Sequence, residues 1–460
     1  MKLSESIAYR IIGDNCIVIL ADEGEMIFLN ETAGFILQLI DQDLDKHKIT
    51  NQITDRYGIK ISEAEQDYEQ IITQFLALNI LKDQPTLSVS SLKEDNMVIP
   101  QNDEMRGQLK AYCQNNFIPL QCFIELTSLC DFACKHCYVP PVAKPKNTLM
   151  KNLRIEEYKN ILSKLSKMGC LEIVFTGGEV SLNKDWLELC SYARSLRFSV
   201  IIKTHAAKLS HEIISKLREY HVTEVQVSLY SMAPEIHDEF VGRQGSHAKT
   251  VSALRYMHSV GQRCRISCVV TMSNYKHLDG IKEFAESIDA PIGFDLVVTR
   301  RLDHSSDPLS ERLTAQALEW LDNNGVMSNI IFEGSQQITA PQELEKLVSY
   351  PSEEDNSPIC GAANTMMAIG CTGDVRPCIT FPVSLGNIRE KALQDIWWGD
   401  NKTASNIRQL RNRDFSECVG CGYSKACPRC IATIYQETGN PVGKAEVICQ
   451  TSVYHNKYSG

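Results

Sequence analysis

Three closely spaced cysteines are the residues in this chain best suited to chemistry. Cys130, Cys134 and Cys137 have the spacing C-x3-C-x2-C, and Tyr138 follows the last of them. They could be buried apolar side chains, or ligands of a zinc ion that His136 completes, although this spacing is not a usual zinc pattern. They could also hold a [4Fe–4S] cluster with one open iron. An open metal position is typical of a catalytic site, so the pattern favours the cluster.

The strands and helices around these cysteines must bring them to a common site. From residue 121 to residue 300 the sequence alternates between β-rich runs and helical patterns, which predicts a parallel sheet of six βα units. Such units form an open doubly wound sheet or a partial barrel, and both place active sites at the carboxyl ends of the strands. Cys130 comes just after the first strand, so we expect it there. The expected strands are 122–127, 171–176, 198–204, 224–230, 265–272 and 292–298.

Composition narrows the class of protein. A chain of 460 residues predicts two or three domains. The net charge of -10, without a run of Lys or Arg, argues against a nucleic-acid or anionic-membrane partner. The sequence shows neither a long apolar span nor a signal peptide, so we expect a cytoplasmic protein. In a reducing compartment, its 18 cysteines are better suited to binding metal or to redox chemistry than to disulfides.

The cysteine loop and its following aromatic residue resemble the signature of the radical S-adenosylmethionine superfamily. The resemblance implies that Cys130, Cys134 and Cys137 hold a [4Fe–4S] cluster whose open iron binds the methionine part of S-adenosylmethionine. It also implies that the cluster donates one electron, the sulfonium C–S bond breaks, and a 5′-deoxyadenosyl radical removes a hydrogen atom from substrate. The fold implied is α/β, a partial (β/α)6 TIM-like barrel over residues 118–310.

Other residues at strand ends resemble the cofactor contacts of this superfamily. The run FTGGEVSL contains Gly177, Gly178 and Glu179, similar to a GGE motif in which glycines allow close approach to a ligand and the acid accepts from the cofactor ammonium. Ser228 resembles a ribose or carboxylate contact, and Arg243 resembles an arginine that pairs with the cofactor carboxylate. The expected cofactor contacts are Tyr138, Gly177, Gly178, Glu179, Thr204, Ser228 and Arg243.

Two positions depart from the superfamily pattern. Relatives often have Thr-Asn-Gly after the third strand, where this chain has Thr204, His205 and Ala206. Many relatives also have an acid after the fourth strand, where this chain has Tyr230. We therefore assign no role to His205 or Tyr230 from the sequence.

The cysteines of residues 360–460 resemble those of a SPASM domain, a cysteine-rich iron–sulfur domain, although CxxC pairs also occur in zinc ribbons. The resemblance implies one auxiliary [4Fe–4S] cluster held by Cys418, Cys421, Cys427 and Cys449. It implies a second held by Cys360, Cys378 and Cys430, which makes three clusters in the chain. This second cluster has only three ligands, so either Cys371 completes it or a substrate thiolate binds its open iron.

Residues 1–82 are expected to form a winged-helix-like α+β module of three strands and three helices. Asn30 is expected to cap the first helix, and Ser62 with Glu65 to form a capping box on the third. The module resembles PqqD, in which a leader peptide adds as a strand to the sheet edge. A DNA-binding winged helix is the alternative, but a basic recognition helix is missing. Residues 83–117 are expected to be a linker with one short helix, and residues 311–359 a bridging region.

The three resemblances together predict a peptide maturase similar to the sactipeptide and ranthipeptide synthases. The leader of a ribosomal precursor peptide would dock on residues 1–82, and a core cysteine sulfur would bond to a carbon of an acceptor residue. The auxiliary clusters would accept the released electron, and a flavodoxin- or ferredoxin-type protein would supply the reducing electron. The alternatives are carbon–carbon crosslinking, formylglycine-type oxidation of a peptide or protein, and a peptide-binding iron–sulfur or zinc scaffold without activity.

Overall fold

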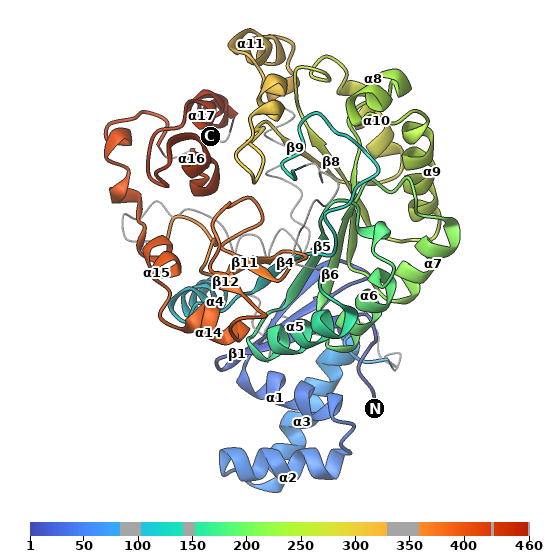
Figure 1. The fold of residues 1–460 in the computed structure, drawn as a ribbon. Helices are drawn as coiled ribbons and strands as arrows, with labels where there is room; N and C mark the ends of the chain where they lie inside the picture. The colour runs from blue at the N-terminus through green and yellow to red at the C-terminus, as the bar shows by residue number, and fades with distance from the viewer. Residues whose placement is uncertain (83–102, 141–151, 329–357, 425–426, 459–460) are drawn as a thin grey trace.

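One nine-stranded sheet lies at the centre of the molecule (Figure 1). The computed structural model describes residues 1–82, 103–140, 152–328, 358–424 and 427–458. Six strands of the sheet are parallel and follow one another in chain order. They are β4 (Gln121–Glu125), β5 (Glu172–Thr176), β6 (Ser199–Thr204), β7 (Glu224–Ser228), β8 (Cys264–Val269) and β9 (Ile292–Asp295). The predicted α/β class and the six strands are confirmed, whereas closure into a partial barrel stays a prediction.

Helices between successive strands cover one face of this sheet (Figure 1). They are α5 (Ile155–Lys167), α6 (Trp186–Ser195), α7 (His211–Glu219), α8 (Pro234–Val241), α9 (Ser246–Ser259) and α10 (Asp279–Ser287). Alternate residues of a strand face opposite sides, so Ile173 and Phe175 pack in the helix-side core. Val174 faces the other side, where it packs with Phe123 and Ile201. Polar residues that share this inner side can therefore line a site at the strand ends.

The C-terminal strands join the main sheet, which the sequence did not predict. β10 (Met366–Ile369) pairs in parallel with β4, and β11 (Asp374–Arg376) and β12 (Gly386–Asn387) follow as antiparallel strands. The cysteine-rich region is thus continuous with the α/β sheet. The helices of the cysteine-rich region are α14 (Leu393–Trp398), α15 (Lys402–Gln409), α16 (Ile431–Thr438) and α17 (Glu446–Tyr458). Helix α11 (Ala315–Asn323) precedes this region.

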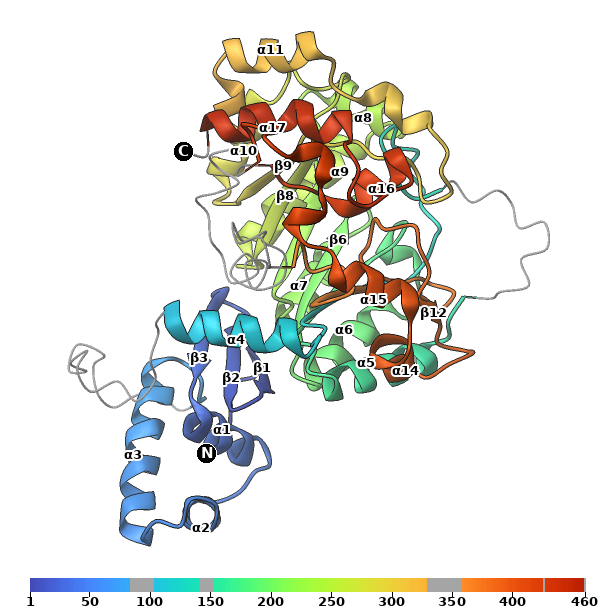
Figure 2. The same cartoon turned by 90° about the vertical axis from the view of Figure 1, so that its left-hand side faces the viewer.

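The N-terminal module is a three-stranded antiparallel sheet with helices on both faces (Figure 2). Its strands are β1 (Ile7–Ile12), β2 (Asn15–Leu20) and β3 (Glu25–Leu29). One face packs on α1 (Glu31–Asp41), α2 (Lys46–Tyr57) and α3 (Ile61–Ala77). The other face packs on α4 (Asp103–Asn115), which the sequence placed in a linker as one short helix. The expected three strands and three helices are confirmed, and the likeness to a winged helix stays a prediction.

The two predicted helix caps of this module have different outcomes. The Asn30 side chain accepts a hydrogen bond of 2.9 Å from the Ala33 amide, so the predicted cap of α1 is confirmed. The capping box of Ser62 and Glu65 is wrong, because α3 begins at Ile61 and Ser62 already lies inside it. The N-cap is Lys60, whose side chain makes no capping hydrogen bond.

Several sequence-based expectations extend beyond the described parts of the chain. Residues 83–102 of the predicted linker and 329–357 of the predicted bridging region lie outside the described residues. The domain boundaries themselves stay a prediction. Within the described parts, no helix is both long enough and apolar enough to cross a membrane.

Candidate functional site

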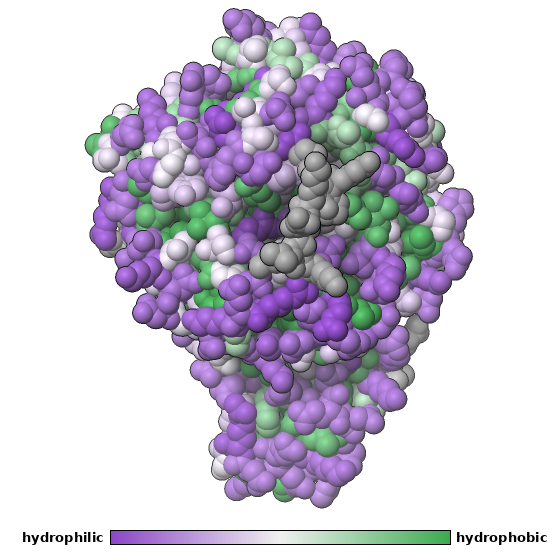
Figure 3. Space-filling model, viewed as in Figure 1, coloured by the Kyte–Doolittle hydropathy of each residue, from purple (hydrophilic) through white to green (hydrophobic). Residues whose placement is uncertain are grey.

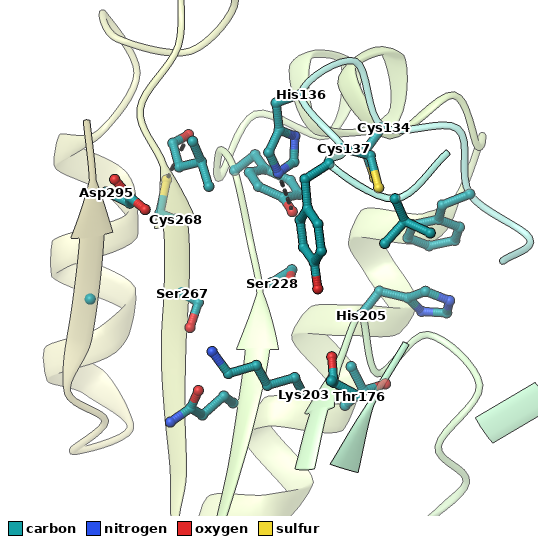
Figure 4. Close-up of a pocket in the computed structure, with 18 of the residues that line it drawn as sticks. Cys134, His136, Cys137, Thr176, Lys203, His205, Ser228, Ser267, Cys268 and Asp295 are labelled. Carbon is teal, nitrogen blue, oxygen red and sulfur yellow. Dashed lines mark hydrogen bonds between the residues drawn. The ribbon is translucent and has the colours of Figure 1, made fainter. Parts of the chain in front are cut away.

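A cavity of about 730 Å³ lies at the carboxyl ends of the parallel strands (Figure 4). The loop after β4 brings Cys130, Cys134 and Cys137 to its wall. Ile379 and Thr380, which directly follow Cys378, also line it. One continuous cavity therefore joins the predicted radical site to a segment of the cysteine-rich region. The space-filling view shows the same face of the molecule as Figure 1 (Figure 3).

The cysteine loop is anchored by α8. The Ala133 amide donates to the Val241 carbonyl at 2.8 Å, and the Lys135 amide donates to the Phe240 carbonyl at 3.2 Å. Gly242 follows with φ 66°, and a Cβ there would meet the Ala133 side chain at 3.2 Å. The C-terminal turn of α8 thus fixes the loop between Cys130 and Cys137.

The three thiols of this loop differ in exposure, with Cys130 exposed and Cys134 and Cys137 half-buried. Burial raises the pKa of the Cys130 thiol to about 11. Burial also raises the pKa of Cys134, and the charges of Cys137 and Cys130 raise it further. Without metal these thiols stay protonated at neutral pH, whereas a bound metal deprotonates them. A donor set of three adjacent thiols, with no fourth cysteine on the loop, fits a [4Fe–4S] cluster with one open iron.

The GGE turn packs directly against the start of the cysteine loop. A Cβ at Gly177 would lie 2.3 Å from the Thr127 carbonyl oxygen, and one at Gly178 would lie 2.1 Å from that of Leu129. The Gly178 and Glu179 amides donate to these same two carbonyls, at 2.7 and 2.8 Å. The absent side chains let the loops after β4 and β5 pack together. Gly177 and Gly178 also line the cavity, and their close approach to a ligand stays a prediction.

Glu179 is the acceptor in a hydrogen-bond network at the end of β6. Its side chain is 1% exposed. One carboxylate oxygen accepts from the Ser181 amide (3.0 Å) and hydroxyl (2.6 Å) and from the Thr204 hydroxyl (2.8 Å). The other oxygen accepts from the His205 amide at 3.1 Å. These donors hold a negative charge in a fixed position at the cavity wall.

The His205 ring joins this network to the cysteine loop, a contact that sequence reasoning missed. Its Nδ1 accepts from the Ala207 amide at 3.1 Å, so we assign the proton to Nε2, which lies 3.0 Å from Asp131 Oδ1. Phe132 stacks on the ring at 3.8 Å between centroids. Ligand atoms of Cys130, Asp131 and His205 all lie within 4.8 Å of one another. The sequence signal that could have revealed this contact was His205 itself, which replaces the usual asparagine after the third strand.

The remaining predicted cofactor contacts have different positions. Tyr138, Thr204 and Ser228 line the cavity, and Figure 4 shows Ser228 at the end of β7. Arg243 does not line it, because the turn between α8 and α9 leaves its side chain exposed. The backbone there is set by Asp238, whose carbonyl accepts from the Arg243 amide at 2.9 Å. The structure therefore does not bring Arg243 together with the other predicted contacts.

His136, the candidate fourth zinc ligand, is engaged elsewhere. Its Nε2 lies 3.4 Å from the Tyr230 hydroxyl, and its ring stacks on Phe240 at 5.1 Å. Burial, with Arg301 nearby, lowers the pKa of His136 to about 4, so the ring is neutral. The geometry thus gives the zinc alternative no support.

The C-terminal cysteines lie in two sets whose members affect one another's pKa, and their role as cluster ligands stays a prediction. Burial raises the pKa of Cys378 to about 11, with a further contribution from Cys430, and Cys360 is a neighbour of both. The second group shows the same mutual effects among Cys418, Cys421, Cys427 and Cys449.

Cys371 belongs to neither of these groups. Burial raises its pKa, Glu125 raises it further, and Ser128 hydrogen-bonds the thiol. These neighbours place Cys371 at the end of β4, away from the thiols of Cys360, Cys378 and Cys430. In this structure it therefore does not complete the three-cysteine group.

Polar residues on the inner face of the strands complete the cavity and were missed from the sequence. Lys203 of β6, Ser267 of β8 and Asp295 of β9 line it (Figure 4). Burial raises the pKa of Asp295, and the charge of Lys203 opposes that rise. The available signal was a charged or polar residue in an otherwise apolar strand.

Comparison with known families identifies three regions of the chain. Residues 124–285 match the radical SAM superfamily, residues 360–428 match SPASM, an iron–sulfur cluster-binding domain, and residues 16–81 match coenzyme PQQ synthesis protein D (PqqD). The chain therefore contains radical SAM, SPASM and PqqD domains. These domains imply S-adenosylmethionine and [4Fe–4S] clusters as cofactors.

Individual relatives share this organisation to different extents. The chain is 24% identical over 424 residues to the antilisterial bacteriocin subtilosin biosynthesis protein AlbA of Bacillus subtilis. The alignment covers 88% of this chain and 84% of that protein. It is 27% identical over 329 residues to the AdoMet-dependent heme synthase of Methanosarcina barkeri, covering 69% and 92%. A crystal structure of Streptococcus suis SuiB bound to precursor peptide SuiA has a TM-score of 0.61, with 21% identity over 98% of this chain and 99% of that one. That likeness shows the fold alone.

Proposed function

We propose that this enzyme forms thioether crosslinks between a cysteine sulfur and an acceptor carbon in a ribosomally made precursor peptide. The observation that carries the proposal is the single cavity that reaches from the Cys130–Cys137 loop to Thr380. The Thr380 hydroxyl lies 3.8 Å from the Cys378 thiol. A peptide in this cavity can present one residue to the radical site and a cysteine to the auxiliary site.

We propose three binding sites for iron–sulfur clusters in the chain. Cys130, Cys134 and Cys137 would hold the radical cluster, and the two C-terminal groups would hold one auxiliary cluster each. When bound together, the radical cluster and S-adenosylmethionine supply a 5′-deoxyadenosyl radical that removes one hydrogen atom from a substrate carbon. Glu179 offers a fixed carboxylate for the cofactor ammonium, with Thr204 and Ser228 on the same wall.

The balance of bonds and electrons in thioether formation defines what the auxiliary site must do. Each link breaks one C–H and one S–H bond and forms one S–C bond. One hydrogen atom, one proton and one electron therefore leave the peptide. A deprotonated cysteine sulfur close to the acceptor carbon favours this step. The group of Cys360, Cys378 and Cys430, from which Cys371 is absent, supports a position for that sulfur beside Thr380.

Leader recognition is proposed for the N-terminal module. Among the described residues, the partner strand of β3 is β2, and we propose that a leader joins this small sheet by adding a strand. The opposite edge strand, β1, is held against the α/β body by a hydrogen bond of 3.1 Å from the Tyr9 amide to the Arg197 carbonyl. The match of residues 16–81 to PqqD and the alignment with the subtilosin protein over 88% of this chain support a peptide substrate.

Mass spectrometry of a precursor peptide tests the proposal. The candidate peptide is a short cysteine-containing product encoded beside the gene, incubated with reconstituted enzyme, S-adenosylmethionine and reductant without oxygen. We expect each link to remove two hydrogens and one alkylatable thiol. Modification that leaves every thiol alkylatable would favour carbon–carbon crosslinking instead. Conversion of Ser or Cys to formylglycine would indicate the oxidase alternative.

Two controls complete this experiment. Cys134→Ala is expected to abolish formation of 5′-deoxyadenosine, and continued formation would exclude the proposed cluster ligands. A core peptide without its leader is expected to react much more slowly than the full precursor. Equal rates would contradict leader docking while leaving the thioether chemistry intact.

A further inference from the structure

The loop after β9 lies against the cysteine loop and binds its backbone. Arg301 Nη1 donates to the carbonyl oxygens of Cys137 and Val139, both at 3.0 Å. Between them, the Tyr138 carbonyl accepts from the Leu302 amide at 2.9 Å. Three consecutive carbonyls, beginning at the third cysteine of the motif, are thus held by two neighbouring residues from a distant part of the chain.

The Arg301 guanidinium brings a largely buried positive charge to this position. Its side chain is 13% exposed. Its ion pair among the described residues is with Asp307, whose carboxylate lies 4.0 Å from Nε and is 79% exposed. Asp303, whose pKa is lowered by Ser305 and further by Arg301, is a second carboxylate near this charge. The two hydrogen bonds from Nη1 direct the guanidinium at the backbone of the cysteine loop.

The loop that carries Arg301 is itself fixed to α16. Arg312 forms a two-point ion pair with Glu437 of α16, at 3.2 and 2.7 Å, and donates to the Val298 carbonyl at 2.8 Å. The contacts of Arg312 tie the loop that carries Arg301 to the C-terminal region, so the charge of Arg301 has a defined position. Arg300 lies farther from the same carboxylate, at 3.8 Å.

We propose that Arg301 is a positioning residue for the cysteine loop and that its fixed charge raises the reduction potential of the radical cluster. Reduction makes a cluster more negative, and a nearby cation in a poorly solvated site stabilises that more negative state. The two hydrogen bonds also hold the backbone that follows Cys137. The inference rests on the proposed ligands Cys130, Cys134 and Cys137, but not on which bond the enzyme forms in its peptide.

The experiment is a redox titration of the full-length reconstituted enzyme without oxygen, followed by electron paramagnetic resonance. The signal that changes on addition of S-adenosylmethionine identifies the radical cluster, and iron content is measured in parallel. Arg301→Gln removes the charge, Arg301→Lys keeps it, and Arg300→Gln is the matched control. Arg300 is the adjacent arginine, but among the described residues its ion pair is with Glu437 of α16.

We expect Arg301→Gln to shift the midpoint potential of the radical cluster to more negative values. Arg301→Lys is expected to keep a potential close to that of the native chain with lower iron occupancy, because it cannot reproduce the planar guanidinium contacts. An unchanged potential in Arg301→Gln, or an equal shift in Arg300→Gln, would overturn the proposal. If Arg301→Gln holds no cluster, the midpoint potential of Arg301→Lys tests the proposal instead. A large shift of that potential, although the positive charge is kept, would contradict the charge effect.

Failure of the ligand assignment has a different signature. Cys137→Ala is expected to remove the signal that responds to S-adenosylmethionine. If that signal persists, the proposed ligands are wrong and the function proposed above fails with them. If it disappears while the potential of Arg301→Gln is unchanged, only the role of Arg301 fails.

Discussion

The carboxylate of Glu125, the last residue of β4, lies 2.5 Å from the guanidinium of Arg376, the last residue of β11. Their side chains are 13% and 7% exposed. Both strands belong to the nine-stranded sheet, but Glu125 leads into the cysteine loop and Arg376 leads to Cys378. This ion pair therefore joins the segment that leads to the cysteine loop to the segment that leads to Cys378, and both segments contribute to the cavity wall.

Removing one partner of this pair is expected to destabilise the fold. Arg376→Met leaves the Glu125 carboxylate buried without its cation, a change that typically costs about 3–5 kcal/mol. We expect a lower thermal unfolding temperature by circular dichroism. The double variant Glu125→Gln/Arg376→Met should be more stable than Arg376→Met alone, because no buried charge is left unpaired. Additive effects of the two substitutions would show that the pair is not energetically coupled.

A buried histidine behind the cysteine loop predicts a loss of stability in mild acid. His237 is fully buried, and burial followed by the effect of His247 lowers its pKa from 6.5 to about 4. Between these pH values the unfolded chain binds a proton at His237 and the native chain does not. Its contribution to stability is therefore present above pH 6.5 and is lost as pH falls toward 4.

The size of this effect follows from the two pKa values. Between pH 7 and pH 5, His237 should account for about 2 kcal/mol of lost unfolding free energy. Urea unfolding of the native chain and of His237→Gln at both pH values measures it. We expect a smaller loss in the variant, and equal losses in the two proteins would contradict the assigned pKa shift.

Much of the fold follows from local sequence patterns. The β-rich runs after residue 120 and the three strands of the first 82 residues become strands, because each pattern matches the burial of its own segment. Pairing between distant segments has no such local signal. The pairing of β10 with β4, which adds three strands to the sheet, depends on an edge that the C-terminal residues must reach in space.

The candidate site likewise combines residues that have a local sequence signal with residues whose contacts come from distant segments. Cys130, Glu179 and Ser228 were predicted because they resemble superfamily motifs and also follow strands whose ends meet at one edge. Arg301 was not predicted, because its partners are backbone carbonyls, which have no sequence signature. Arg243 matched a motif, but the turn after α8 leaves it outside the cavity wall.

Glu179 supplies a prediction about binding of S-adenosylmethionine. Glu179→Gln removes the proposed charge for the cofactor ammonium and turns an amide N–H₂ toward protein donors. Loss of a hydrogen bond to a charged group corresponds to about 1.5–3 kcal/mol, so the dissociation constant should rise about 10- to 100-fold. Equilibrium dialysis of the reconstituted enzyme without oxygen, at matched iron content, measures this change.

Thr204→Val is the matched control for Glu179. It removes the hydroxyl that donates to the Glu179 carboxylate at 2.8 Å but leaves the negative charge in place. We expect a smaller rise in the dissociation constant than in Glu179→Gln. An equal rise in both variants would indicate that the network, and not the charge of Glu179, determines affinity.

Cys371 and Cys378 provide a paired test of the auxiliary site. Burial and the nearby Glu125 carboxylate keep the Cys371 thiol protonated, and Cys360, Cys378 and Cys430 are not among the described groups that shift its pKa. We therefore expect Cys371→Ala to retain the native iron content after reconstitution, whereas Cys378→Ala loses up to one cluster's worth of iron. Colorimetric iron analysis and Mössbauer spectroscopy distinguish the two results. Equal iron losses would mean that Cys371 moves to complete the group, which would close the position proposed for the substrate sulfur.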